Sequence, residues 1–562
     1  MNPVDLEILW SRLISVVNEQ AAALMRTSFT PIVREVGDLS AAVFDARGLM
    51  LAQAVTGTPG HINSLATGMK HFLKAYPAST LREGDVLITN EPWLTSGQLN
   101  DLSVVTPVFR EGEVVGFFGN TCHAADIGGR GLSADAAEVY EEGIRIPITK
   151  LYSAGEPNDE LIKLIRANVR VPEEVMGDIH AQVAGNQVGA QRLLAYLQDF
   201  DLNDLDELGR EILGRSEQAM RGAIRAIPDG VYEKVCHTDG YDEPIRIRLR
   251  LTVQGDEIAC DYSGSSDQVE RGFNCVLNYT TAYSNYALKC AICPEVPHND
   301  GSFRPVTVTA PEGSIFNPRF PAAVAARQIA GHYLPHAIFG ALAPVLEKRV
   351  MAEGAGGIWL ATIRGRGENR FVSVFFCAGG TGARPAQDGL STTAFPSGVA
   401  ASPVEVIETI SPVVIRRKEY RRDSGGPGRY RGGLGQSIEV EVRTGEPYVV
   451  SVLSDRFRAP AEGYLGGKPG ARSGFTIRPG GKRDPKLSTP LPAGAVFRLE
   501  LPGGGGFYDP TTRDREKLAE DLAEGLISKA GARRDYGLSS GPWRTATRRP
   551  GRVTRSRKTR SA

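Results

Sequence analysis

The sequence predicts a mixed α/β (α+β) protein of several domains: an α/β N-terminal unit, a helical middle and a β-rich, glycine-punctuated C-terminal half. The first observation is length, since 562 residues exceed what one hydrophobic core usually organises. The second is that apolar residues change along the chain from helical to strand-like spacing and back. The third is a long stretch of short apolar runs separated by glycine and proline, from 296 to 510.

The N-terminal unit, residues 1–150, is expected to combine helices with buried strands. Apolar residues recur at helical spacing from Leu6 onward, and this pattern ends near Thr27. Four short β-branched and aromatic runs follow and are expected to be strands: "AAVFDARGLMLAQ", "GDVLITN", "DLSVVTPVF" and "EVVGFFGNT". A helical stretch, "HINSLATGMKHFLKAY", lies between the first and the second of these runs. Only the short turn "REGEV" separates the last two runs, so we expect these two strands to pair antiparallel.

The remaining segments are assigned by the same patterns. Residues 151–230 have helical periodicity, and 231–510 are expected to be mixed but mostly β, opening with the alternating ribbon "IRIRLRLTVQGDEIACDYSGSS". One helix, "YTTAYSNYALKCAIC", is expected within that region. Residues 511–538 predict a pair of helices. Residues 539–562 are basic, without an acidic residue, and are expected to be a disordered tail.

The overall composition is that of an ordinary soluble globular protein. The chain has 65 basic and 65 acidic residues, so its charge balance indicates neither nucleic acid nor a membrane surface as a partner. The first 25 residues resemble an amphipathic helix and not an export signal, and the apolar runs fall short of the roughly 20 residues that span a bilayer. We therefore expect a cytoplasmic location.

The cysteines do not indicate a disulfide framework. There are seven, an odd number, scattered along a chain without an export signal. Cys290 and Cys293 form one C-x-x-C pair, but a zinc ribbon needs a second pair and a redox motif needs a βαβ setting. Buried helix cysteines are therefore favoured over a metal or redox role.

The most informative stretch for chemistry is "GNTCHAADIGGRG", which follows a predicted buried strand. Polar groups beside buried strands are costly unless they are paired or bind something. Cys122, His123 and Asp126 follow that strand, and the preceding strand begins at Asp101. Antiparallel pairing would bring Asp101 and His123 together. Imidazole with carboxylate suits Zn²⁺, Mn²⁺ or Fe²⁺.

Three interpretations of this cluster remain open from the residues themselves. It is a metal centre, a hydrogen-bonded structural His–Asp pair, or a nucleophilic Cys122 with its base. The thiol is least favoured because Cys122 alternates with His123 along the strand and faces the opposite side. Other isolated polar residues are interpreted as caps or satisfied core groups, namely Asp38, His61, Asp178 and His180.

The glycine-rich runs do not predict a nucleotide site. "PGGGGFYDP" and "DSGGPGRYRGGLG" allow sharp turns, but neither has the order of residues found in a phosphate-binding loop. Tight turns in β structure are the favoured interpretation.

Ordered motifs along nearly the whole chain carry a family resemblance. They begin with "VDLEILWSRLISVVNEQAAALMRTSFTPIVREVGDLSAAVFDARGLMLAQ" and continue through "HAADIGG", "EEGIRIP", "DYSGSSDQV", "FRPVTVTAPEGSIFNPRFPAAVAAR", "GGTGARPAQDG", "SPVEVIE", "SGGPGRYRGGLG", "LGGKPGARS" and "LPGGGGFYDP". With these motifs the sequence resembles the family of hydantoinase B, 5-oxoprolinase and acetone/acetophenone carboxylase.

The resemblance implies a metal-site subunit that works with a larger, hydantoinase A-like subunit, which binds ATP. It implies metal ligands at Asp38, Asp101 and His123. Gln98 stands where the family's pattern has a further histidine ("QLND" here), which affects the choice among zinc, manganese and iron. His123 and Asp126 would be the catalytic pair, with Asp126 orienting His123.

The reaction is expected to be one of two, with a third possibility outside catalysis. The favoured expectation is a ketone carboxylase that adds ATP-activated bicarbonate to an enol or enolate, because Gln98 suggests a specialised branch. The alternative is ATP-dependent hydrolysis of a cyclic amide such as a hydantoin, 5-oxoproline or a lactam. The third is a non-catalytic scaffold subunit.

Overall fold

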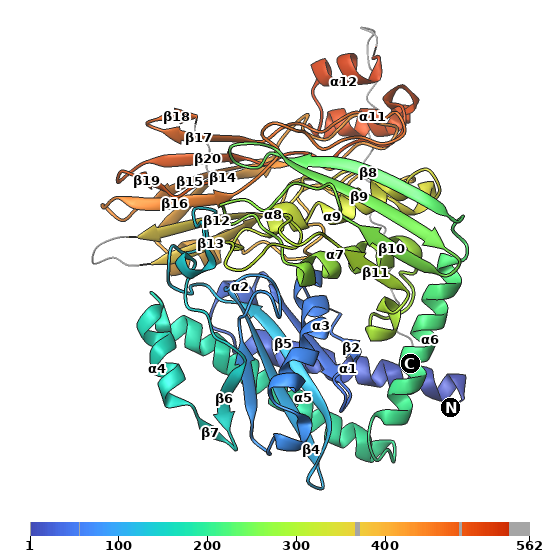
Figure 1. Ribbon diagram of the computed structural model, residues 1–562. Helices are drawn as coiled ribbons and strands as arrows, with labels where there is room; N and C mark the ends of the chain where they lie inside the picture. The colour runs from blue at the N-terminus through green and yellow to red at the C-terminus, as the bar shows by residue number, and fades with distance from the viewer. Residues whose placement is uncertain (1, 56, 366–370, 483–485, 539–562) are drawn as a thin grey trace, which may run out of the picture.

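The computed structural model describes residues 2–55, 57–365, 371–482 and 486–538. The predicted basic tail, 539–562, lies outside the described residues. In Figure 1 the N-terminal sheet lies at the bottom, the β-strands of the C-terminal half lie at the top, and a helical layer separates them. This arrangement confirms the expected mixed fold of helices and several sheets.

The N-terminal sheet has seven strands in the order β2-β1-β5-β4-β3-β6-β7, and every neighbouring pair is antiparallel. The pairing of β4 with β5 is the one that the short turn predicted. The strands are β1 (Leu39–Phe44), β2 (Met50–Gln53), β3 (Val86–Thr89), β4 (Asp101–Arg110), β5 (Glu113–His123), β6 (Thr149–Ser153) and β7 (Glu156–Pro157).

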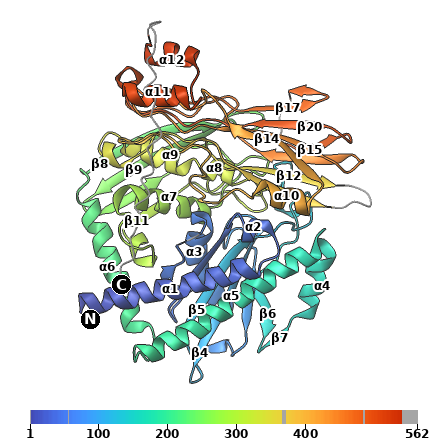
Figure 2. The ribbon, with the colours of Figure 1, turned by 180° about the vertical axis from the view of Figure 1, so that it is seen from behind.

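Helices cover both faces of this sheet. α1 (Pro3–Thr27) and α5 (Pro172–Asp199) lie across the face that Figure 2 shows in front, and α3 (Pro59–Ala75) covers the other. Because side chains alternate along a strand, Val43 packs in the core with α1 while Phe44 packs with α3. Strands of a sheet that is buried on both faces have nearly continuous apolar sequences, as β1 and β5 do.

The helical middle follows the sheet. Here the structure confirms the predicted helices and adds that β6 and β7, at their start, belong to the N-terminal sheet. These helices are α4 (Asp159–Asn168), α5 and α6 (Asp206–Ile224); the short helix α2 (Pro31–Arg34) precedes β1.

A four-stranded sheet, β11-β10-β9-β8, follows the helical middle. Helices α7 (Leu277–Ile292) and α9 (Leu334–Leu342) pack against it, and α7 also packs on α3, which joins this layer to the N-terminal unit. The predicted ribbon is the β9–β10 hairpin. The strands are β8 (Gly230–Thr238), β9 (Ile245–Gln254), β10 (Glu257–Asp261) and β11 (Val306–Thr309).

Two further sheets share one core in the C-terminal half. Trp359, Val440 and Phe497 meet between them and are almost completely buried. One sheet contains β13 (Val372–Cys377), β12 (Trp359–Gly365), β16 (Tyr448–Leu453) and β19 (Thr489–Leu491), and the other contains β14 (Val413–Tyr420), β15 (Gln436–Val442), β20 (Val496–Glu500), β17 (Gly474–Arg478) and β18 (Gly481–Lys482).

Helices interrupt this mostly β region more than the sequence indicated. Gly/Pro punctuation concealed α8 (Gln328–Gly331), α9 and α10 (Val404–Ile410), which are short or lie in apolar, alanine-rich sequence. The predicted C-terminal pair is present as α11 (Arg515–Ala523) and α12 (Lys529–Tyr536). Short 3₁₀ turns occur at η1 (Ala78–Thr80), η2 (Val139–Glu141), η3 (Asp300–Phe303), η4 (Glu347–Arg349) and η5 (Pro510–Thr512).

The glycine-rich runs pack backbone against backbone. Gly504 N–H donates to Gly433 O at 3.0 Å, and Gly426 N–H donates to Gly504 O at 2.7 Å. A Cβ on Gly504 would lie 1.9 Å from Thr381 O, so only glycine fits there. The runs are therefore built into the fold, in agreement with the sequence interpretation.

All seven cysteines are free thiols, and Cys290 is the one that is not fully buried. Cys122 packs in the core with α1, on the face of β5 opposite to His123. Each helix in the described ranges is too short or too polar to cross a membrane.

Candidate functional site

Strand register brings the predicted site residues together. Asp101 at the start of β4 is the direct cross-strand partner of His123 at the end of β5. Asp38 lies immediately before β1, the other neighbour of β5, and its carbonyl accepts a hydrogen bond from His123 N–H at 3.2 Å. The predicted convergence of Asp101 with His123 is thus confirmed, and Asp38 joins them at the same edge of the sheet.

Asp101 is the centre of this group and is fully buried. Its Oδ1 lies 2.9 Å from His123 Nδ1 and 2.7 Å from Gln98 Nε2. Its Oδ2 lies 3.0 Å from His61 Nε2 and also accepts a hydrogen bond from the Arg327 guanidinium. Each carboxylate oxygen of Asp101 therefore contacts two nitrogen groups.

Two opposing effects, burial and the neighbouring charges, set the pKa values of the residues in the site. Burial opposes the charge on Asp101, but the neighbouring His61 and Arg327 outweigh it and hold the pKa of that carboxyl well below its usual range. Burial likewise opposes a charge on His61, yet Asp101 and Asp38 raise the pKa of that imidazole. The site is a network in which charges stabilise each other.

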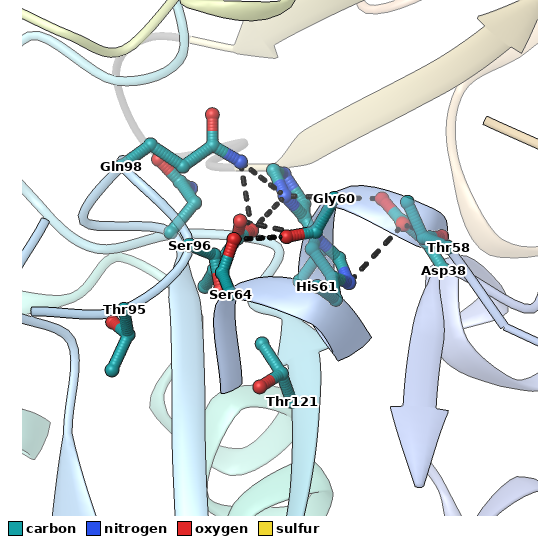
Figure 3. A network of polar contacts seen from close by, with 12 residues as sticks. Asp38, Thr58, Gly60, His61, Ser64, Thr95, Ser96, Gln98 and Thr121 are labelled. Atoms are coloured by element: carbon teal, nitrogen blue, oxygen red, sulfur yellow. Dashed lines mark hydrogen bonds and ion pairs between the residues drawn. The ribbon is translucent and has the colours of Figure 1, made fainter. Parts of the chain in front are cut away.

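Asp38 closes the other side of the group. Its two carboxylate oxygens lie 3.7 Å from His61 Nδ1 and 3.9 Å from His123 Nδ1, distances longer than hydrogen bonds. Thr58, just before α3, donates its hydroxyl to Asp38 Oδ1 at 2.8 Å. Figure 3 shows Asp38, Gln98 and the start of α3, with Thr58 and His61, converging from three segments.

A small cavity of about 30 Å³ adjoins this network. Its polar wall contains Asp38, His61, Gln98 and His123, and its apolar wall includes Phe376. Several buried atoms of the lining residues have no hydrogen-bond partner in the described structure: His61 Nδ1, Gln98 Oε1, His123 Nε2, both amide atoms of Gln328, and Ser397 Oγ. So many unpaired polar atoms around one cavity indicate a ligand site.

The donor set is chemically suited to a divalent cation. Within the described residues, no cluster of three His, Cys, Asp or Glu side chains has the arrangement of a metal site by itself. Gln98 supplies the missing donor: its unpaired Oε1 would replace Nε2 beside Asp101 and His123 after a half-turn of the amide. Two carboxylates, one amide oxygen and one imidazole suit Mn²⁺, Fe²⁺ or Zn²⁺.

Several residues of the site were not assigned to it from the sequence. His61 was interpreted as a cap or core group, but its position in the first turn of α3 aims it at Asp101. Arg327 and Gln328 arrive from α8, more than 200 residues along the chain; Arg327 also stacks 4.1 Å from the centre of the Tyr279 ring. The only available signal was the "PAAVAAR" motif, which ends at Arg327.

His332 completes the wall near α8. Its Nε2 lies 3.0 Å from Tyr283 Oη and 3.2 Å from Tyr279 Oη, and its Nδ1 accepts from Ile358 N–H at 3.3 Å. Burial lowers the pKa of His332 to about 3, so this imidazole is neutral at physiological pH.

Asp126 does not join the group, in contrast to its expected role of orienting His123. Arg170 donates from Nη1 to Asp126 Oδ1 at 2.6 Å, and the backbone N–H groups of Arg170 and Gly128 also bind this carboxylate. The physical reason is local: Asp126 lies in the glycine loop after β5, which turns toward the start of α5. Asp101 and Gln98 orient His123 instead.

Two other buried polar residues, Asp178 and Asn90, have structural roles. Asp178 accepts hydrogen bonds from Phe29 N–H and from the N–H and hydroxyl of Thr30. Asn90 binds the backbone of Leu99 and of Ile146. These are satisfied core groups, as the sequence indicated for Asp178.

Comparisons with known proteins bear on what such a site does. The family model described as hydantoinase B/oxoprolinase matches residues 2–510. A relative from Pseudomonas sp., named as a subunit of a putative D-/L-hydantoinase, is 30% identical over 568 residues, which cover 96% of this chain and 95% of that one.

Two solved structures are similar over nearly the whole chain. The ATP-dependent caprolactamase from Pseudomonas jessenii matches with a TM-score of 0.88 and 27% identity, over 97% of this chain and 98% of that chain. An acetone carboxylase in its nucleotide-free form matches with a TM-score of 0.85 and 19% identity, over 96% and 80%. The latter similarity is one of fold.

Proposed function

Because the chain belongs to the hydantoinase B/oxoprolinase family, we propose that it is the hydrolytic subunit of an ATP-dependent enzyme that opens cyclic amides. The observation that supports this most directly is the buried group of Asp38, His61, Gln98, Asp101 and His123 beside a small cavity with unpaired polar atoms. Similarity to a caprolactamase and to a hydantoinase subunit supports the choice of a cyclic amide as substrate.

The proposed partner is a hydantoinase A-like subunit that binds ATP and phosphorylates the ring carbonyl oxygen. The relatives named as subunits support a two-chain enzyme. In this chain, water would add to the ring carbon that bears the phosphorylated oxygen, and the ring C–N bond would break as nitrogen accepts a proton. A second water would then hydrolyse the acyl phosphate, which releases phosphate and the amino acid, or the N-carbamoyl amino acid where the ring is a hydantoin.

The residues of this chain have distinct parts in that scheme. Asp38, Gln98, Asp101 and His123 would hold a divalent cation, which supplies Lewis acidity to the site. His61, whose pKa Asp101 and Asp38 raise, faces the same cavity with its unpaired Nδ1 and would donate the proton that the ring nitrogen accepts. Arg327 fixes Asp101 and balances its charge.

Ketone carboxylation was preferred from the sequence because of Gln98. That preference has no further support in the structure, since the similarity to acetone carboxylase is limited to the fold. Cyclic amide hydrolysis is therefore the reaction that we propose.

The test is coupled ATP hydrolysis by the complex of this chain with its ATP-binding partner. Lactams, hydantoins and 5-oxoproline would be compared with acetone and acetophenone, each with and without bicarbonate. We expect turnover of a cyclic amide that does not need bicarbonate. Ketone turnover that requires bicarbonate would overturn the proposal in favour of carboxylation, and no turnover with either panel would favour the scaffold interpretation.

A further inference from the structure

A second, larger cavity of about 380 Å³ lies against the small one described above. We call it the outer pocket, and the small cavity the inner cavity. The outer pocket is lined by the segment that leads into α3, by the end of α7 and the loop that follows it, and by Pro396 and Gly398.

The two cavities share a wall at the start of α3. Gly57, Pro59 and Ile62 line the outer pocket, whereas Thr58 and His61 between them line the inner cavity. One short segment therefore has the outer pocket on one side and the candidate centre on the other. The hydrogen bond from Thr58 to Asp38 ties this wall to the centre.

A second segment continues the wall in the same alternating way. Pro396 and Gly398 line the outer pocket, whereas Ser397 and Val399 line the inner cavity. A Cβ on Gly398 would lie 3.8 Å from Gly57 O, so the two wall segments lie close together. Two single-chain segments therefore lie between the cavities.

The sizes of the cavities decide where a substrate can lie. An inner cavity of about 30 Å³ has room for about two water molecules or one ion, not for a ring. The outer pocket, at about 380 Å³, lies within the roughly 300–1,000 Å³ of small-molecule sites. We propose that the outer pocket holds the body of the substrate, whose carbonyl reaches between the two wall segments into the inner cavity. This inference rests on the function proposed above.

The lining indicates the class of substrate. Prolines, Ile62, Val296 and Tyr286 make the walls mostly apolar. The ammonium of Lys289 already donates to the backbone carbonyls of Cys293 and Val296. Such a lining favours a compact ring.

The remaining polar pair in the pocket is neutral. His298 Nε2 contacts Asn63 Oδ1, and burial lowers the pKa of His298 to about 3. The Lys289 ammonium is thus the cationic side chain in this mostly apolar lining. We infer that the substrate is a compact cyclic amide such as a lactam or a hydantoin.

Cys290 provides a direct probe, because it lines the outer pocket and is the thiol that is not fully buried. The full chain would be labelled with methyl methanethiosulfonate at alkaline pH, since burial raises the pKa of this thiol. We expect ε-caprolactam at about ten times its Kd to slow labelling about tenfold. A Cys290→Ser variant gives the background, and equal labelling rates with and without lactams would overturn the inference.

A variant that fills the outer pocket with a larger side chain gives a second test, which is measured as the KM for lactams. In the complex, Cys290→Phe should raise the KM for ε-caprolactam about tenfold or more, with a smaller effect on 2-pyrrolidone. Leu194→Phe, on the exposed side of α5, is the size-matched control. If the complex turns over lactams, but Cys290→Phe leaves the KM unchanged and lactams do not protect Cys290, the outer pocket does not bind the substrate. The proposed function would then still stand. Absence of turnover with every cyclic amide would instead overturn the proposed function.

Discussion

Asp101 and His123 face each other directly across the β4–β5 pair, with 2.9 Å between Asp101 Oδ1 and His123 Nδ1. The centre of the site is therefore fixed by strand register inside a buried sheet. Arg327 reaches the same carboxylate from α8 in the following layer. Through this contact the site joins the N-terminal unit to the α7–α9 layer, so its integrity and the packing of the two layers depend on each other.

The first prediction concerns the charge of Asp101. Asp101→Asn should abolish activity and destabilise the protein by about 3–5 kcal/mol, because it leaves the buried Arg327 guanidinium without its charge partner. Thermal unfolding and coupled ATP hydrolysis by the complex measure the two effects.

The double variant Asp101→Asn/Arg327→Met is the matched control. It removes both charges, so it should recover much of the stability but none of the activity. A double variant as unstable as the single one would show that the ion pair does not join the layers.

The second prediction concerns Gln98. Gln98→His should strengthen binding of Zn²⁺ about tenfold or more, because imidazole is a better zinc donor than an amide oxygen. Competition with a chelator, followed by metal analysis, measures this affinity. Gln98→Ala should weaken binding, and equal affinities in all three proteins would place the cation elsewhere.

The third prediction concerns Gln328, whose two amide atoms are buried and unpaired beside the inner cavity. Gln328→Leu has nearly the same shape and removes two unsatisfied polar atoms, so it should raise stability by about 1 kcal/mol. If those atoms bind the substrate amide, activity should fall at the same time, with a higher KM. A variant that is more stable and equally active would assign Gln328 no part in binding.

The sequence predicted those parts of the fold that depend on local patterns. Apolar periodicity located α1 and α3, and the turn between β4 and β5 predicted the pairing that brings Asp101 to His123. The family resemblance supplied Asp38, which lies beside β5 only because β1 pairs with it. Register rules are local, so a short turn is enough to reveal them.

The rest of the site depends on contacts that no local pattern encodes. His61 sits in a helix where a capping role is equally consistent with its sequence, and Arg327 comes from another layer. The expected contact between Asp126 and His123 is absent from the described structure for the opposite reason. Asp126 is close to His123 in sequence, but the loop after β5 gives its carboxylate to Arg170. Closeness along the chain was therefore a poorer guide to the partner of His123 than strand register, which indicated Asp101.

The last prediction concerns Glu142, which holds the segment leading to Arg327. Its Oε1 accepts hydrogen bonds from Val324 N–H and Ala325 N–H, and Oε2 is buried without a partner. Burial raises the pKa of Glu142 to about 8, so the folded protein keeps this carboxyl protonated at neutral pH.

A pKa that is higher in the folded protein than in the unfolded chain makes stability fall as pH rises. The contribution of Glu142 is complete below the unfolded pKa and is lost as pH rises through about 8. Glu142→Gln keeps the oxygen that accepts both hydrogen bonds and cannot ionise. The variant should therefore match the natural protein near pH 4.5 and exceed its free energy of unfolding by on the order of 4 kcal/mol at pH 8.5. Urea unfolding of both proteins across this range isolates Glu142, because every other titrating group is common to the two. Parallel curves would mean that Glu142 is ionised in the folded protein and that its charge is stabilised by its two backbone donors.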